Sequence, residues 1–586
     1  MIRKLFLFII LILLGAALFL NPNFKTISAG VAILLFGMIM LEDGFKAFTK
    51  GPLQKILRNA TNKLYKSIPV GAFVTALIQS SSLVTVITIS FISAGLISLS
   101  GGLGLIFGAN IGTTATAWLI AAFGLKIKIS ALAMPMLVFG IIFSFQKKNS
   151  LRGIGNILAG LGFFFLGIHY MKEGFDVFKE YIDLTEYAVS GFLGVIIYCF
   201  LGIVITTILQ SSSATLALIL TALAAGQIEY ENALALAIGA NIGTTITAVL
   251  GSLSSNIAGK RLAGAHLVFN FITGIVALVF IYPLANLVDN LSNILGIGST
   301  DYILKLAMFH TIFNVIGVVI MLPFIKLLEK GLLKFLKEKP DKGVDEPKFL
   351  NDAILKFPSS LILALLNESK YLYENSIFEI VTHALNIHRE DIKSNLKAKK
   401  VVKQSKKDLN VDVSELYYTK VKNIYGEIIR HATIGQSALT LSIDDSHQVD
   451  EIKVANRKMV EIIREVQELS KNVTTYLNSE NKSIQNEYDN FRRKIVKVLR
   501  VIYLYRTDIS IEKHHNRLLK LKEEAKRSIH RSNKSINKLI RENKINVDMG
   551  SSLVNDNDNV NDIIKKLIDI AELLYEKRDS LLENGE

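Results

Sequence analysis

The chain has 586 residues, of which 50% are hydrophobic and only 20% are charged. Together with a mean hydropathy of +0.38, this composition excludes an intrinsically disordered chain and argues against a wholly soluble protein. The net charge of +15 is divided: residues 1–336 carry 22 Lys and Arg against 12 Asp and Glu, and residues 337–586 carry 44 against 39. The first part also holds 34 of the 39 glycines. A single cysteine, Cys199, excludes a disulfide framework and a cysteine-based zinc site.

Eight apolar stretches are long enough to cross a bilayer, which takes about 20 residues per helix. They are 5–20, 29–45, 102–122, 130–146, 153–172, 230–250, 263–285 and 302–326. The first could be a signal peptide, but no small-residue cleavage site follows it in residues 21–25, so we expect a retained helix and an outside loop after it. Two further stretches, 68–97 and 192–226, are longer and are interrupted near their middle by hydroxyl residues.

Positive charge in short loops indicates the cytoplasmic side of a membrane protein. The loops 46–66, 147–152 and 260–261 are basic, whereas 174–190 is acidic. All basic loops fall on the cytoplasmic side and the acidic loop on the outer side if each interrupted stretch enters and leaves the membrane on the same side. The N-terminus and everything after residue 326 are then cytoplasmic, and Lys126 with Lys128 is the one exception.

The most specific feature is an internal duplication. Gln79-Ser80-Ser81-Ser82 recurs as Gln210-Ser211-Ser212-Ser213, and 29 residues after each glutamine comes Gly-Ala-Asn-Ile-Gly-Thr-Thr, at 108–114 and 239–245. The basic loop before the first copy corresponds to the acidic loop before the second. We therefore expect two inverted repeats, each with a re-entrant helical hairpin, as in many secondary transporters.

The residues at the two expected hairpin tips suit an oxyanion. Helix N-termini attract anions, and amide and hydroxyl groups complete an anion's shell. The anion site is thus assigned to Gln79, Ser80, Ser81, Ser82, Gln210, Ser211, Ser212 and Ser213. Hard oxygen ligands suit Na+, and the candidates are Asn110, Thr113, Thr114, Asn241, Thr244 and Thr245. The alternative role for such small polar residues is close helix packing.

Two further polar pairs lie in the last apolar stretches. His266 with Asn270 and His310 with Asn314 are each four residues apart, and so share one helix face. They either form hydrogen bonds between the two final helices or line the site.

The paired Gln-Ser-Ser-Ser and Gly-Ala-Asn-Ile-Gly-Thr-Thr motifs, with Ala265-His266-x-x-Phe269-Asn270, resemble the type II sodium–phosphate cotransporters. The bacterial branch, which has a cytoplasmic PhoU-like tail, is the most similar. The resemblance is strong over about residues 29–330. It implies that the tip residues bind inorganic phosphate, and that nearby side chains and carbonyls bind Na+. The helix at 5–20 is not required by it.

The charged part is expected to follow a linker. After Pro358 there is no proline, and apolar residues recur at helical spacing. The expected helices are 360–395, 412–440, 448–478, 485–508, 511–543 and 559–583, which would form two three-helix bundles. Asp444, Asp445, Asp450 and Glu451 match an acidic metal motif poorly, and we assign them to a solvated face. The basic stretch 491–500 either contacts anionic headgroups or is a solvated helix face.

The expected fold is an all-α polytopic membrane protein with a soluble PhoU-like helical bundle. Its parts are an N-terminal membrane helix (1–28), repeat 1 (29–150), repeat 2 with the final helices (151–336), a linker (337–357) and the cytoplasmic domain (358–586). We expect a sodium-coupled inorganic phosphate transporter of the cytoplasmic membrane, working by alternating access. Alternatives are a transporter of another oxyanion and a phosphate-sensing regulator acting through the tail.

An enzyme is not expected, because no base lies in sequence near the serines to activate them. No cofactor is expected beyond Na+ as the coupling ion. Expected partners are phosphate, sodium and the lipid bilayer, without nucleic acid. A homodimer and a cytoplasmic regulatory partner of the tail are left open.

Overall fold

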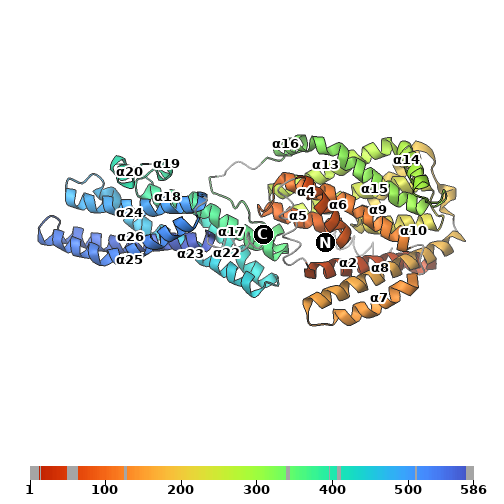
Figure 1. Cartoon of the computed structure of the whole chain (residues 1–586), viewed down its shortest axis with the longest axis horizontal. Coiled ribbons are helices and arrows are strands. Elements are labelled where there is room, and N and C mark those ends of the chain that lie inside the picture. Colours follow the sequence, from red (N-terminus) through yellow and green to blue (C-terminus); the bar gives the residue numbers. More distant parts are fainter. Residues whose placement is uncertain are drawn as a thin grey trace. The chain divides into compact units, whose positions relative to one another are not determined.

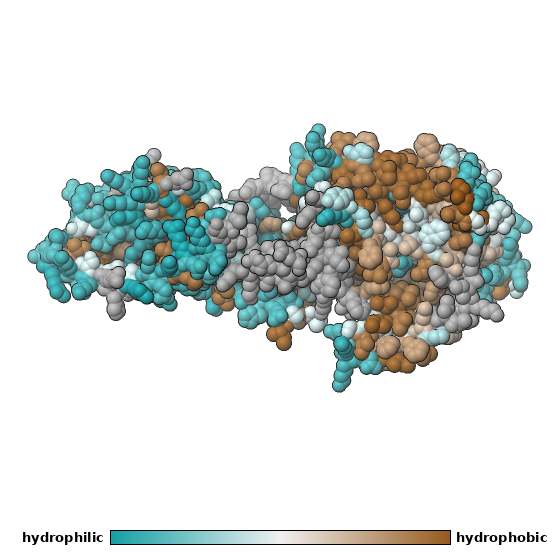
Figure 2. All heavy atoms as spheres, viewed as in Figure 1, coloured by the Kyte–Doolittle hydropathy of each residue, from teal (hydrophilic) through white to brown (hydrophobic). Residues whose placement is uncertain are grey.

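The computed structural model describes residue 12 and residues 15–48, 64–124, 129–181, 183–337, 343–394, 396–405, 409, 411–508 and 511–575. All regular elements over these residues are helices (Figure 1). The chain divides into two compact units, Met1–Glu338 and Lys339–Glu586. Apolar surface dominates the first unit and polar surface the second (Figure 2). The division falls where the composition changes.

The first unit contains fourteen labelled α-helices over its described residues. These are α2 (Pro22–Phe48), α4 (Leu64–Ile78), α5 (Ser81–Ser93), α6 (Leu99–Leu119), α7 (Ile129–Ser144), α8 (Asn149–Lys179), α9 (Gly191–Leu209), α10 (Ser212–Ala224), α11 (Tyr230–Gly243), α12 (Thr245–Ser252), α13 (Ile257–Val279), α14 (Ile281–Ile294), α15 (Tyr302–Met321) and α16 (Ile325–Phe335). Within the described ranges, seven helical segments are long and apolar enough to cross a membrane. The expectation of an all-α polytopic membrane protein is confirmed.

The N-terminal part differs from the expectation of two helices separated by a loop. Most of the stretch 5–20 lies outside the described residues, but residues 15–20 are helical and α2 begins at Pro22. Backbone bonds from Asn21 N to Ala17 O (3.1 Å) and from Lys25 N to Asn21 O (3.0 Å) cross the junction. Proline is tolerated in a first helical turn because its missing N–H has no partner there. The expected domain boundary at residue 28 therefore falls inside a helix.

The first interrupted stretch forms a helical hairpin, α4 and α5. Glycines let α4 and the following α6 touch backbone to backbone: a Cβ on Gly108 would collide with the carbonyl oxygen of Ile68, and one on Gly112 with that of Ala72. Both contacts advance together along the two helices, so α4 and α6 are parallel. Since α5 joins the end of α4 to the start of α6, it must run back alongside them. With 15 and 13 residues, α4 and α5 measure about 23 and 20 Å, less than the bilayer core of about 30 Å.

The second interrupted stretch repeats this packing 131 positions later in the sequence. A Cβ on Gly239 would collide with the carbonyl oxygen of Cys199, and one on Gly243 would lie 2.8 Å from that of Ile203. Helices α9 and α11 are therefore parallel, and α10 runs back between their ends. Cys199 is a free cysteine buried in this contact.

The two hairpins open towards opposite ends of the unit. At the base of the first, Asn256 Nδ2 donates to Ser93 O (3.0 Å). At the base of the second, Leu184 N donates to Gln227 Oε1 (3.2 Å). The path α11–α12 starts just after Gln227 and ends just before Asn256, so it runs from one base to the other. The tips are directed towards each other.

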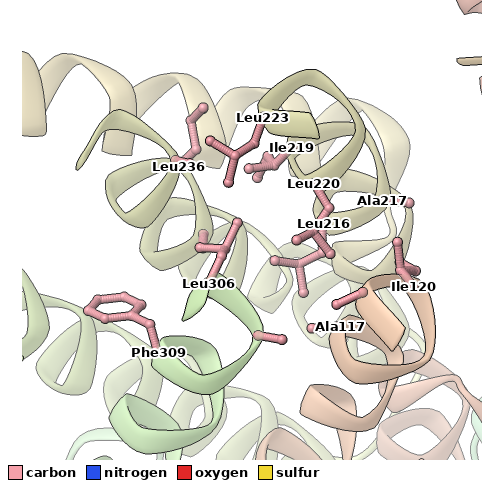
Figure 3. Packing of buried hydrophobic residues seen from close by; sticks show 14 of the residues in the cluster. Ala117, Ile120, Leu216, Ala217, Ile219, Leu220, Leu223, Leu236, Leu306 and Phe309 are labelled. Carbon is pink, nitrogen blue, oxygen red and sulfur yellow. The ribbon is translucent and has the colours of Figure 1, made fainter. Parts of the chain in front are cut away.

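A long antiparallel pair, α2 and α8, supports these elements. Three glycines of α2 lie against three of α8 with no room for side chains; the pairs are Gly30–Gly167, Gly37–Gly160 and Gly44–Gly153. Behind the second tip, Leu216 and Leu220 of α10 join a buried cluster with Ala117 of α6 and Leu306 of α15 (Figure 3). The core of this unit thus combines residues from both repeats.

The second unit contains α17 (Pro358–Tyr371), α18 (Phe378–Ala384), α19 (Arg389–Lys393), α20 (Ala398–Gln404), α21 (Val413–Lys420), α22 (Lys422–Ala438), α23 (Ile443–Tyr476), α24 (Lys482–Thr507), α25 (Ile511–Arg541) and α26 (Val547–Tyr575). Helices α17, α22 and α23 pack together, as do α24, α25 and α26. Two expected helices are interrupted: 360–395 ends at Ala384, and 412–440 breaks at Val421. The last begins at Val547 rather than 559. A PhoU-like fold stays a prediction.

The basic stretch 491–500 has an internal role that sequence analysis missed. Buried Arg492 donates through Nε to Leu385 O (2.8 Å) and through Nη2 to Ser405 O (2.7 Å). Arg500 Nη2 donates to Asp391 O (2.8 Å). These arginines bind the backbone of Leu385, Asp391 and Ser405 to α24, so neither a headgroup contact nor a solvated face describes them. The acidic residues also have local partners: Asp445 forms a capping box with Ser442.

Candidate functional site

The Gln-Ser-Ser-Ser sequence produces each helix break. Gln79 and Gln210 have φ of 59° and 53°, in the left-handed region where a helix ends. The next residue is extended and caps the following helix: Ser80 Oγ accepts from Leu83 N, and Ser211 Oγ accepts from Ala214 N, both at 3.2 Å. The first serine of each motif is thus an N-cap.

The second and third serines open α5 and α10. Ser81 and Ser212 are the first helical residues, and their side chains make no hydrogen bond among the described residues. First-turn N–H groups have no partner within a helix, and the helix dipole adds positive potential there. Each tip therefore offers a hydroxyl and backbone donors at the helix end that faces the other tip.

Threonines of the crossing segments connect the two tips. Thr116 Oγ1 donates to Gln79 Oε1 (2.8 Å) and lies 3.3 Å from Ser213 Oγ. Thr247 Oγ1 lies 3.3 Å from Ser82 Oγ. The contacts Ser213–Thr116 and Ser82–Thr247 are copies of each other with the repeats exchanged, because Ser213 lies 131 positions after Ser82 and Thr247 lies 131 positions after Thr116. Each tip therefore contacts the other repeat.

Sequence analysis missed Thr116 and Thr247. The unbroken identity between the two copies stops at the end of the heptapeptide. After one variable position, however, Thr-Ala follows in both copies, at 116–117 and 247–248. Extending the comparison across that position would have found both threonines.

The heptapeptide residues proposed as sodium ligands lie buried near these contacts. Thr113 and Thr244 donate to Ala109 O and Ala240 O, both at 2.9 Å. Thr114 and Thr245 also donate to carbonyls of their own helix, those of Ile111 (2.7 Å) and Ile242 (2.8 Å). A hydroxyl that donates keeps its oxygen lone pairs for a cation. The glycines of the motif serve close packing, the alternative role considered above.

The two asparagines of the motif differ in their surroundings. Asn110 Nδ2 donates to Ile106 O within its own helix (3.0 Å). Asn241 Nδ2 donates to both Asn270 Oδ1 (3.1 Å) and Asn314 Oδ1 (2.9 Å). The structure therefore brings Asn270 and Asn314 together through Asn241, across α11, α13 and α15.

The two histidines expected beside these asparagines are buried as well. Asn270 Nδ2 and Asn314 Nδ2 donate to the backbone oxygens of His266 (3.1 Å) and His310 (2.8 Å). The Nδ1 atoms of His266 and His310 are buried without a hydrogen-bond partner. The imidazoles are thus not part of the bonded asparagine group.

The two tip glutamines are not equivalent. Gln79 is bound at both ends of its amide, by Thr116 and by the Ala76 carbonyl, which accepts from Nε2. Gln210 is exposed, and its side chain makes no hydrogen bond among the described residues. No lysine or arginine occurs in residues 67–125 or 180–259, so neither hairpin supplies a fixed positive charge.

Two opposed broken hairpins with polar tips inside an apolar helical unit define a class, the polytopic membrane transporters. The family model described as Na+/Pi-cotransporter matches residues 33–173 and 192–310, which include both hairpins. The first unit of this chain is therefore similar to that family, which is a transporter family.

Three curated relatives each match between about half and three fifths of this chain. The "Putative inorganic phosphate export protein YjbB" of Salmonella typhimurium is 29% identical over 345 residues, covering 58% of this chain and 61% of the relative. The Escherichia coli K12 protein of the same name is 27% identical over the same shares. The "Uncharacterized protein YqeW" of Bacillus subtilis is 29% identical over 51% of this chain and 94% of its own length. The chain thus spans about three fifths of the export proteins. No solved structure matches.

Proposed function

We propose that this chain is a sodium-coupled transporter of inorganic phosphate, with phosphate bound between the two hairpin tips. One observation carries the proposal: the N-termini of α5 and α10, with their serine hydroxyls, are joined through Thr116, which contacts Gln79 and Ser213. The names of the related export proteins support phosphate as the substrate.

The donor set suits a tetrahedral oxyanion. The hydroxyls of Ser81 and Ser212 and the first-turn N–H groups of two helices would donate to phosphate oxygens from two directions. Ser82 and Ser213 already contact the threonines of the opposite repeat, so they can position the tips as well as donate. Because Thr116 holds the side chain of Gln79, this glutamine would stay in the site and orient the first tip.

Sodium would offset the charge that the hairpins leave uncompensated. Phosphate carries between one and two negative charges near neutral pH, and these segments contain no cationic side chain. The oxygens of Asn110, Thr113, Thr114, Asn241, Thr244 and Thr245 are suitable hard ligands. Since Asn241 is fixed by two neighbours, we propose that its half of the site is the more preorganised.

Alternating access would follow from hairpins that open to opposite ends. Placing the basic loops in the cytoplasm puts the base of α4–α5 on the cytoplasmic side and that of α9–α10 outside. Phosphate would cross a cytoplasmic membrane if the tips became accessible first from the side of one hairpin base and then from the side of the other. The second unit would then be cytoplasmic and is proposed to regulate transport.

The test is phosphate flux in proteoliposomes with and without a Na+ gradient. Wild-type flux should depend on the gradient. Ser81→Ala and Ser212→Ala should each reduce the flux at least about tenfold, because each variant loses one charge-assisted hydrogen bond to phosphate. Thr88→Val and Thr221→Val are matched controls, because each hydroxyl bonds only within its own helix, to Val84 O and Ala217 O. Gradient-independent flux would refute sodium coupling. Normal flux in both serine variants would refute the site.

A further inference from the structure

Helix α16, which follows the last long apolar helix of the first unit, packs one side against α13 (Figure 1). A 3-10 turn, Leu322–Phe324, separates it from α15. Its Leu332 is buried, with Cδ2 only 3.3 Å from where a Cβ on Gly264 would lie. Arg261 Nε also donates to Leu336 O at 3.0 Å. One side of α16 is therefore fixed to the beginning of α13.

A second side of α16 exposes large apolar side chains. Leu327 and Phe335 are eight positions apart, which places them about 80° apart around a helix. They are 66% and 84% exposed, and Phe324, three residues before Leu327, is 52% exposed. A single exposed apolar residue is ordinary, but several on one side of a helix indicate a surface that is covered by something other than water. We call these three residues the apolar flank.

A third side of α16 is basic. Its lysines recur every three or four residues and so form one row along the helix. All are exposed, and we call them the lysine ridge: Lys326, Lys330, Lys334 and Lys337. The helix contains a single acid, Glu329, so residues 325–337 carry four positive charges against one negative charge.

An apolar flank beside a lysine ridge matches the surface of a membrane that contains anionic lipids. The flank belongs to the first unit, whose surface is mainly apolar (Figure 2). Through the bond from Arg261 to Leu336, α16 ends beside the basic loop 260–261, which the charge pattern assigns to the cytoplasm. The cytoplasmic leaflet carries anionic lipid, and each lysine near it strengthens binding about fivefold.

We propose that α16 binds anionic lipid headgroups of the cytoplasmic leaflet, with the apolar flank among the acyl chains and the lysine ridge at the headgroup phosphates. Lysine side chains suit this position because their stems cover apolar surface while the charge stays in water. The role does not depend on which solute the hairpins transport. It places the end of the first unit at the headgroup level of the membrane.

The experiment is native mass spectrometry of the full-length protein in detergent, titrated with an equimolar mixture of phosphatidylglycerol and phosphatidylcholine. Wild type should bind phosphatidylglycerol in preference. Lys330→Gln/Lys334→Gln should reduce this preference at least about tenfold, because two attractive charges are lost. Lys147→Gln/Lys148→Gln is the matched control, since it removes two exposed lysines from another basic loop expected on the same side. The control should keep the wild-type preference.

Three results of this titration would overturn the proposal. They are a wild-type protein without preference, an unchanged preference in Lys330→Gln/Lys334→Gln, and an equal loss in that variant and the control. Displacement of phosphatidylglycerol by inorganic phosphate at constant ionic strength also overturns it, because the lysine ridge would then bind the free anion. None of these results depends on transport, so failure of the proposed function is distinguishable.

Two further measurements test the apolar flank and replace a variant that fails to fold. Leu327→Ser/Phe335→Ser should weaken binding of both lipids without changing the oligomeric state, and a changed state overturns the proposal in favour of a second copy of the chain. For wild type, the preference should vanish at about 1 M salt, where the Debye length is about 3 Å. A preference that persists there overturns the role of the exposed lysines.

Discussion

Replacing Thr116 by valine tests whether the connection between the tips matters. Valine has nearly the same shape but removes the bond to Gln79 Oε1 (2.8 Å) and the contact with Ser213 Oγ (3.3 Å). A neutral hydrogen bond contributes about 1 kcal/mol, and an abandoned buried acceptor costs about 1–3 kcal/mol. The half-buried Gln79 Oε1 places the loss at about 2 kcal/mol, or about thirtyfold in an equilibrium constant.

The assay is the phosphate KM and maximal flux in proteoliposomes for Thr116→Val, with two comparison variants. Thr247→Val removes one cross-repeat contact, that with Ser82 at 3.3 Å, and should cost about 1 kcal/mol, or about fivefold. Thr88→Val loses only a bond within its own helix. Flux parameters for Thr116→Val equal to those for Thr88→Val would refute the reasoning.

Three further predictions concern packing and the second unit. Gly239→Ala should abolish stable folding because its Cβ meets a backbone carbonyl, whereas Gly331→Ala on α16 has open space and should express normally; detergent-solubilised yield is the readout. Arg492→Met should destabilise the second unit by about 3 kcal/mol because a buried hydrogen-bonded charge is lost, against under about 0.5 kcal/mol for Arg493→Met, measured by pulse proteolysis in urea. Burial raises the pKa of Asp556, so its contribution is fully present below the unfolded pKa and is lost as pH rises through the folded one. Relative to Asp556→Asn, wild type should therefore lose stability as pH rises from about 4, and an unchanged difference would contradict this.

The helix breaks could be predicted from sequence because each combines local signals. Polar Gln-Ser-Ser-Ser interrupts an apolar run, glutamine can adopt a left-handed conformation, and serine is a preferred N-cap. Their repetition made the assignment specific. The hydrogen bond from Ser80 Oγ to Glu42 Oε2 (3.5 Å) could not be predicted, since the two residues are 38 positions apart and Glu42 lies outside the repeated motifs.

Two other features could not be predicted from the sequence, for physical reasons. Asn110 and Asn241 stand in identical heptapeptides, yet only Asn241 bonds to α13 and α15, because tertiary neighbours break the equivalence of the repeats. Helix α26 was expected to begin too late because its first turns bury polar residues. Asp556 and Asn557 are 3% and 0% exposed, and a search for apolar periodicity overlooks such a face.

The glycine contacts of α4 with α6 and of α9 with α11 restrict how the protein can move. Helices that touch at carbonyl oxygens cannot slide by a fraction of a turn without backbone collision. The outer helix of each hairpin should therefore travel as one rigid body with its crossing helix. Rearrangement is left to α5 and α10, whose far ends carry Gly95 and Gly226 at φ of 72° and 67°. These two glycines are the natural pivots for short levers whose other ends are the serine tips.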